Sequence, residues 1–105
     1  MYEHDVLVVG GGGAGLRAAI AAQEAGADVA IVSKLHPVRS HTGAAEGGIN
    51  AALREGDSWQ AHAKDTMKGA DYLADAPAVE TFARTAPEEV MQLEHWGMPF
   101  SREED

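Results

Sequence analysis

Val6-Leu7-Val8-Val9-Gly10-Gly11-Gly12-Gly13-Ala14-Gly15 is the stretch that decides the fold of this chain. Its four leading residues end a strand that we expect at 5–9, because a continuous β-favouring run stopped by glycine is typical of a buried strand. Residues 14–25 are rich in alanine and read as a helix that Gly26 can end. Residues 28–32 repeat the strand pattern, so the chain should begin as an α/β fold with a right-handed β-α-β crossover.

The glycine loop matches the pattern G-x-G-x-x-G between a strand and a helix. Gly10 would allow a tight turn, Gly12 would let the backbone approach a pyrophosphate, and Gly15 would let the helix pack on the strand. The phosphate charge would face the helix N-terminus. The pattern therefore predicts dinucleotide binding by Gly10, Gly11, Gly12, Gly13, Ala14 and Gly15.

The second strand is not followed by the acidic residue that usually binds a ribose hydroxyl in NAD-binding proteins. Ser33 and Lys34 stand there instead. Ser33 could bond to a ribose and Lys34 could neutralise a phosphate, or the pair could simply be a strand end and a solvated lysine. The NAD fingerprint is therefore incomplete, and the glycine loop alone does not choose between NAD and FAD.

Residues 34–48 have little periodicity and contain three glycines, so we predict a long ordered loop, a kind of segment that is commonly functional. It includes Arg39-Ser40-His41-Thr42-Gly43-Ala44-Ala45-Glu46-Gly47-Gly48. An imidazole offered to the cofactor from this loop suggests chemistry on the cofactor itself.

The rest of the chain reads as helical. We expect a short helix at 48–53 and a longer one at 58–69, capped by Asp57 or Ser58. The residues 75–77 should open a third helix that ends near Thr85, and Pro87 should open a fourth that ends near 96–97. His62 and Asp65 are one turn apart, but two side chains are too few for a metal, so we expect a solvated helix face and no metal site.

Composition narrows the classes of function. The net charge of −9, from 17 acidic and 8 basic residues, disfavours unaided binding to nucleic acid or to anionic lipid. The absence of cysteine excludes disulfides, thiolate zinc sites and iron–sulfur ligation by this segment. No apolar run approaches the ~20 residues that span a bilayer. The acidic start lacks the pattern of a signal or transit peptide, so we expect a cytoplasmic protein without direct membrane insertion.

The stretch from Arg39 to Gly48 closely resembles the flavin-attachment signature of the flavoprotein subunits of succinate dehydrogenase and fumarate reductase. That signature, Arg-(Ser/Thr)-His-(Ser/Thr)-x-x-Ala-x-Gly-Gly, is met at every fixed position. The glycine loop, the pair Ser33-Lys34 and the stretches 62–75 and 92–102 also look like this family. The resemblance implies an FAD site that includes Arg39, Ser40, His41, Thr42, Ala45, Glu46, Gly47 and Gly48.

In this family the histidine corresponding to His41 forms a covalent bond from its imidazole to the 8α carbon of FAD, and the bond raises the reduction potential of the flavin. An imidazole is a good nucleophile near neutral pH. The family carries Gln or Glu at position 46, and this chain has Glu46. A carboxylate near the flavin ring should lower its potential, so Glu46 is expected to favour fumarate reduction or easy reversibility.

The resemblance further implies the N-terminal part of a Rossmann-like FAD-binding domain that occupies residues 1–105, with the capping and C-terminal domains absent. The implied activity is interconversion of succinate and fumarate. Electrons would pass to an iron–sulfur subunit and a quinone, with a membrane anchor holding the complex on the inner face of the cell membrane. We expect the dicarboxylate-binding and catalytic residues beyond Asp105, and no turnover by this segment alone.

The residues leave three alternative functions open. A related FAD oxidase such as L-aspartate oxidase shares the glycine loop but should lack a histidine at position 41. An NAD-dependent dehydrogenase is disfavoured by the missing acidic residue. A nucleotide-binding fragment without catalysis is the third.

Overall fold

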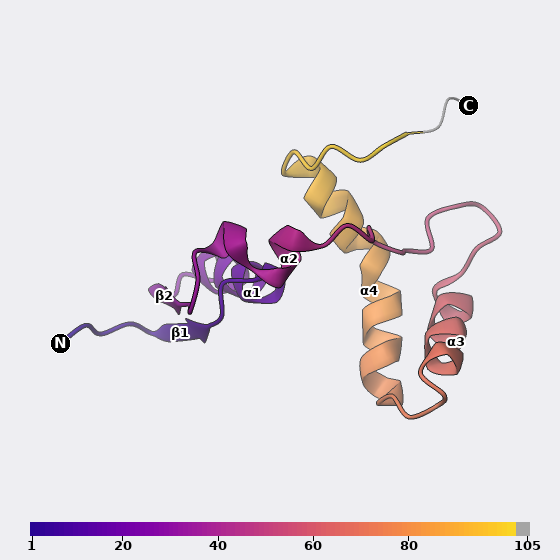
Figure 1. Ribbon diagram of the computed structural model, residues 1–105, viewed down its shortest axis with the longest axis horizontal. Coiled ribbons are helices and arrows are strands. Elements are labelled where there is room, and N and C mark those ends of the chain that lie inside the picture. Colours follow the sequence, from indigo (N-terminus) through magenta and orange to yellow (C-terminus); the bar gives the residue numbers. More distant parts are fainter. Residues whose placement is uncertain (103–105) are drawn as a thin grey trace. The chain divides into compact units, whose positions relative to one another are not determined.

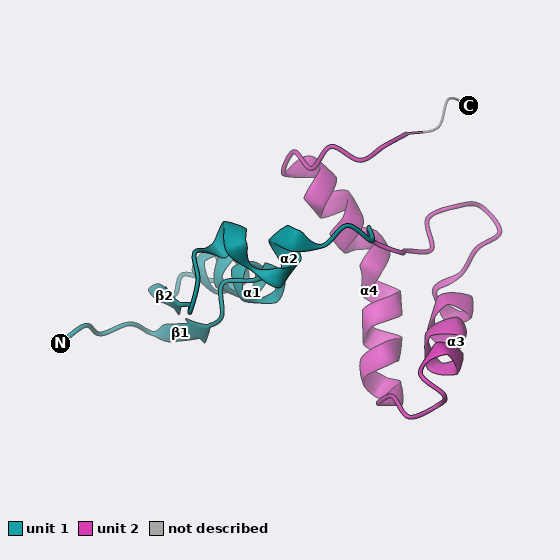
Figure 2. Ribbon diagram, in the orientation of Figure 1, with its two compact units in different colours: residues 1–48 teal, residues 49–105 magenta. Residues whose placement is uncertain are grey.

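The computed structural model describes residues 1–102 and divides the chain into two compact units, Met1–Gly48 and Ile49–Asp105. Figure 2 shows the first unit in teal and the second in magenta. Each unit is described by itself below.

The first unit contains the expected β-α-β arrangement (Figure 1). Strand β1 spans Val6–Val9, helix α1 Gly13–Glu24 and strand β2 Val29–Val32. The strands are parallel and pair Val6 with Val29 through Val9 with Val32. Side chains of β1 alternate between half-buried and exposed positions, with Leu7 59% and Val9 81% exposed. The α/β fold class predicted from the sequence is thereby confirmed.

Helix α1 ends where the sequence predicts. Gly26 has a φ of +91°, a left-handed conformation that glycine adopts without strain. Its N–H donates to the carbonyl of Gln23 at 2.9 Å, and the N–H of Ala27 donates to the carbonyl of Ala22 at 3.1 Å. These two bonds form a Schellman motif, which satisfies carbonyl groups at the end of the helix and turns the chain back toward β2.

The segment between β2 and the end of the first unit is ordered, as expected, but it is not all loop. It contains a 3₁₀ helix, η1, at Pro37–Arg39 and a single helical turn, α2, at His41–Ala44. Sequence periodicity could not show these elements because each is shorter than two turns. Local capping and contacts with the glycine loop, described below, hold them instead.

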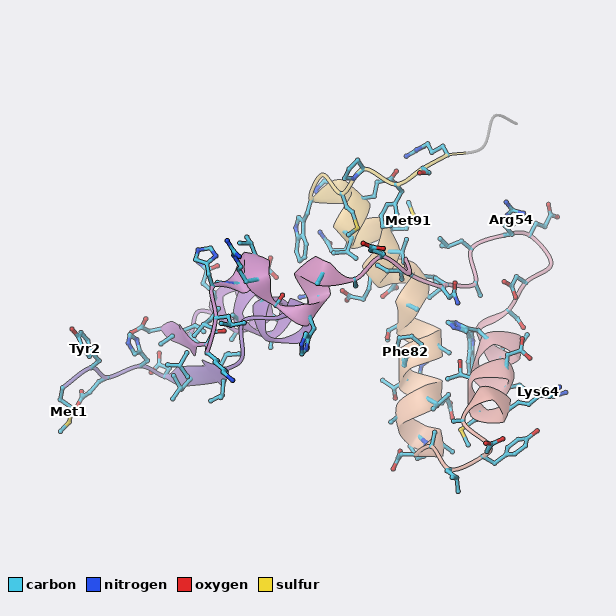
Figure 3. All side chains as sticks on the ribbon, in the orientation of Figure 1. Met1, Tyr2, Arg54, Lys64, Phe82 and Met91 are labelled. Atoms are coloured by element: carbon cyan, nitrogen blue, oxygen red, sulfur yellow. The ribbon has the colours of Figure 1, made fainter. Side chains whose placement is uncertain are left out.

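The second unit is a pair of helices, α3 at Trp59–Gly69 and α4 at Ala76–His95. The Ser58 hydroxyl accepts a hydrogen bond from the N–H of Ala61 at 3.1 Å and caps α3, as predicted. His62 is half-buried, and its ring meets Phe82 of α4 edge to face with 5.6 Å between ring centroids. The expected solvated face of α3 is therefore wrong for His62, whereas Lys64 points away from α4 (Figure 3).

Helix α4 runs unbroken through Pro87, so the prediction of two helices that meet near that residue is wrong. Proline lacks an N–H and weakens a helix interior. Here the inward-facing positions keep a helical period on both sides of it, and Ala83 and Ala86 are buried. Helix α4 contacts α3, and burial of this stripe offsets the missing hydrogen bond. The half-buried or buried positions of the stripe are Val79, Ala83, Ala86, Val90 and Leu93.

The short helix predicted at 48–53 is absent, and this segment has no regular secondary structure. Gly48 has a φ of +76°, which a right-handed helix does not allow. A helix of so few residues also gains too few hydrogen bonds to offset the cost of its first turn. Within residues 1–102 no helix is both long and apolar enough to cross a membrane.

Candidate functional site

The glycine loop lies at the edge of the sheet where both parallel strands end. The N–H of Gly10 donates to the carbonyl of Val32 at 2.8 Å, which extends the strand pairing into the loop. Gly10 then turns with a φ of +118°. A hollow of about 350 Å³ opens at this edge, the place where open α/β sheets bind ligands. Its lining residues are Gly10, Gly11, Gly12, Ser33, Lys34, Leu35, Arg39, Ser40, His41 and Thr42.

Close packing within the first unit requires glycine at position 15 and leaves little room for a side chain at position 11. A Cβ at Gly15 would lie 1.9 Å from the carbonyl oxygen of Gly10 and 3.3 Å from Val8 Cγ1. A Cβ at Gly11 would lie 3.0 Å from Ser33 Oγ and 3.3 Å from Pro37 Cγ. Gly15 thus lets the helix start close to the strand end, and Gly11 lets the segment after β2 lie against the loop.

A hydrogen bond joins the glycine loop to the segment that carries His41. The N–H of Gly13 donates to Thr42 Oγ1 at 3.0 Å, across 29 positions of the sequence. Thr42 also fills the space beside the loop, since a Cβ at Gly13 would lie 3.1 Å from Thr42 Cγ2 and one at Gly12 3.4 Å from Thr42 Oγ1. The absence of a side chain at Gly13 therefore makes room for Thr42, whereas a Cβ at Gly12 would be at ordinary contact distance from it.

The turn that carries His41 is capped at its own start. Ser40 Oγ accepts a hydrogen bond from the N–H of Gly43 at 3.2 Å. Gly43 is needed here because a Cβ would lie 2.7 Å from the carbonyl oxygen of Val38. His41 is the first residue of α2, and its exposed side chain contributes to the wall of the hollow.

The electrostatics of the hollow suit an anion. Lys34 and Arg39 line it, and the lining residues, all within the described part of the chain, include no carboxylate. The N-terminus of α1 adds the partial positive charge of its N–H groups, and its first turn contains no acidic residue. Gly11, which is buried, and Gly12, which is half-buried, contribute their backbone to the lining of the hollow. These features fit the pyrophosphate of a dinucleotide.

The structure brings together most, but not all, of the site residues predicted from the sequence. Gly13, Ala14 and Gly15 form the first turn of α1 beside the hollow. Four other predicted residues follow the end of the hollow-lining segment, are exposed, and do not line the hollow: Ala45, Glu46, Gly47 and Gly48. Sequence reasoning missed two residues, Leu35 in the lining and Gly43 within α2. The close approach that demands Gly43 comes from tertiary packing, so the sequence carried no signal for it.

A glycine loop between a strand and a helix, facing a cationic hollow at the end of a parallel strand pair, defines a dinucleotide-binding protein of the Rossmann type. Residues 5–105 match the family described as FAD binding domain. The chain therefore belongs to the FAD-binding domain family, and its relatives include flavoprotein subunits of succinate dehydrogenase and fumarate reductase.

The similarity to these relatives covers nearly the whole chain. The chain is 56% identical over 105 residues to the fumarate reductase flavoprotein subunit of Mycobacterium tuberculosis, and the match covers 98% of this chain and 18% of that protein. It is 52% identical over 106 residues to the succinate dehydrogenase flavoprotein subunit of Rickettsia bellii, covering 99% and 18%. Among solved structures, a variant of the E. coli quinol fumarate reductase FrdA superposes with a TM-score of 0.91 at 48% identity, covering 97% and 18%. The chain thus spans about a fifth of the length of these relatives.

Proposed function

We propose that this chain forms part of the flavoprotein subunit of a succinate dehydrogenase or fumarate reductase and binds FAD covalently through His41. The observation that carries the proposal is the shared hollow, because the glycine loop and His41 contribute to the same wall. FAD would supply the two-electron redox chemistry for interconverting succinate and fumarate.

The residues of the hollow have separable roles in this proposal. The N-terminus of α1 and the backbone of Gly11 and Gly12 would receive the pyrophosphate. Lys34 and Arg39 would neutralise its charge, and Ser33 would bond to a ribose hydroxyl. His41 would offer an imidazole nitrogen for the bond to the flavin, and its exposure leaves that nitrogen accessible.

The partners and the location follow from the same proposal. The names of the relatives describe flavoprotein subunits, and one similar structure is a quinol–fumarate reductase with menaquinol molecules. By analogy, electrons would pass between the flavin and a quinone through an iron–sulfur subunit. A membrane anchor subunit would hold the complex on the inner face of the cell membrane, without direct insertion of this chain.

Acid denaturation of the full-length subunit tests the covalent bond. We expect flavin fluorescence on the protein band after the denatured subunit is separated by electrophoresis. Flavin released wholly into the supernatant would exclude attachment at His41 and favour a related oxidase that holds FAD without a bond. Succinate should reduce the flavin of the intact subunit and L-aspartate should not, which separates the same two activities.

A second expectation concerns the redox potential and depends on Glu46, which is exposed just after α2. We expect Glu46→Gln in the full-length subunit to raise the flavin midpoint potential, because the variant removes a negative charge that opposes reduction. An interaction of about 1 kcal/mol corresponds to roughly 20 mV for a two-electron couple. Potentiometric titration of the flavin absorbance measures this shift.

The control for that titration is Glu24→Gln, which makes the same change of charge at the opposite end of α1 from the glycine loop. It should leave the potential unchanged, because an exposed charge at that distance is screened by salt. An unchanged or lower potential in Glu46→Gln would remove the proposed influence of Glu46 on the direction of the reaction.

A further inference from the structure

We propose that Thr42 is a positioning residue that holds His41 against the dinucleotide loop for attachment of the flavin. The inference rests on the proposed function, because it concerns how the attachment histidine is held. It assigns to Thr42 a contact with the glycine loop in addition to its place in the lining of the hollow. Three observations carry it.

The first observation is that helix α1 has no capping side chain at its own N-cap position. Gly12 occupies the N-cap position of α1 and has no side chain with which to accept a hydrogen bond from the first turn. Thr42 Oγ1 accepts the N–H of Gly13, the first residue of the helix, at 3.0 Å. A hydroxyl from a distant segment therefore performs the capping role that Ser or Thr usually performs at the N-cap itself.

The second observation is the fit of the Thr42 methyl group. A Cβ at Gly13 would come within 3.1 Å of Thr42 Cγ2, so this side chain lies directly against the glycine backbone. The hydroxyl and the methyl group thus contact the same loop. Both groups restrain the main chain of Thr42, and His41 is its immediate neighbour.

The third observation is the length of α2. His41–Ala44 makes a single turn, and a turn of this length is unstable without outside contacts. The Ser40 cap stabilises the turn internally, through the N–H of Gly43. Thr42 supplies the hydrogen bond that ties the turn to the glycine loop, and so it sets where His41 lies relative to a cofactor bound there.

The test compares three variants of the full-length subunit. Thr42→Val keeps the shape and removes the acceptor, Thr42→Ser keeps the hydroxyl, and Thr42→Ala removes both groups with little risk of a clash. Covalent flavin is followed over time by fluorescence of the acid-denatured band, and total FAD is measured before denaturation. We expect Thr42→Val and Thr42→Ala to slow attachment by about fivefold, as loss of one hydrogen bond predicts. Thr42→Ser should attach flavin at close to the wild-type rate, and total FAD should change less than the rate does.

Attachment at the wild-type rate in Thr42→Val and Thr42→Ala would overturn the inference, and so would a Thr42→Ser variant as slow as they are. Hydrogen–deuterium exchange of a peptide that covers residues 10–15 gives a readout independent of the flavin bond. Exchange of the Gly13 amide should be faster in Thr42→Val than in Thr42→Ser. If the wild-type subunit carries no covalent flavin, the proposed attachment fails, and the exchange rates still decide whether Thr42 holds the two segments together.

Discussion

Replacing Gly15 with alanine should strongly weaken FAD binding by the full-length subunit. The new Cβ would lie 1.9 Å from the carbonyl oxygen of Gly10, and this oxygen belongs to the main chain, so no flexible side chain can move aside. Relief requires a shift of α1 away from β1, which displaces the helix N-terminus from the hollow. Overpacking of this kind costs about 3 kcal/mol. If that cost falls on the binding-competent state, FAD affinity drops about a hundredfold.

Gly69→Ala is the matched control for Gly15→Ala. Gly69 is the last residue of α3, a Cβ there meets no atom within 4 Å, and its backbone is not left-handed. Fluorescence titration of the apo subunits with FAD compares the two variants. We expect Gly69→Ala to bind like the wild type. Wild-type affinity in Gly15→Ala would show that the close approach of α1 to Gly10 is not needed.

The β-α-β part of the first unit could be predicted from the sequence because its signals are local. The apolar run of β1 ends at a glycine, and Gly26 sits at the one position after α1 where a left-handed residue is needed. Strand pairing then follows from the β-α-β order, since a helical crossover joins parallel strands. Local propensity and tertiary packing agree throughout this part of the chain.

The second unit shows where local signals mislead. Pro87 reads as the start of a new helix, yet the buried positions on either side of it, such as Ala83 and Val90, keep one helical period. Burial of this side of α4 decides the outcome, and a local pattern does not show which positions are buried. At 48–53 the opposite error occurs, because a short helix is expected there while the left-handed Gly48 prevents one from starting at that residue.

The candidate site likewise has a part that the sequence could predict and a part that only the structure shows. The glycine pattern and the histidine signature identify the residues by type and spacing, and the hollow shows that His41 lies near Gly12. The sequence could not indicate why Gly13 lacks a side chain, because its neighbour Thr42 is 29 positions away. It assigned the space at Gly12 to a pyrophosphate, and in the structure Thr42 Oγ1 lies 3.4 Å from a Cβ built at that position, at ordinary contact distance. The loop therefore has two neighbours to accommodate, the cofactor and the turn that carries His41.

Replacing His41 with glutamine should eliminate covalent flavin from the full-length subunit. Glutamine is polar and of similar length, but its amide nitrogen is not a nucleophile. The two hydrogen bonds that hold α2, from Gly43 to Ser40 and from Gly13 to Thr42, do not use the His41 side chain. The fold of the turn should therefore survive, and Lys34 and Arg39 should still hold FAD without a bond. Fluorescence of the acid-denatured band should fall by more than about a hundredfold, since no other group of the turn can replace the imidazole.

His36→Gln is the control for this variant, because it makes the same substitution in the same segment outside the hollow. His36 precedes η1, and only its carbonyl oxygen takes part in the local bonding, accepting the N–H of Arg39 at 2.8 Å. Its side chain does not line the hollow. Covalent flavin should therefore remain at the wild-type level in His36→Gln. Flavin that stays on the His41→Gln band and disappears from the His36→Gln band would move the attachment point to His36. Loss of covalent flavin in both variants would indicate that the segment tolerates no substitution and that His41 has no special role.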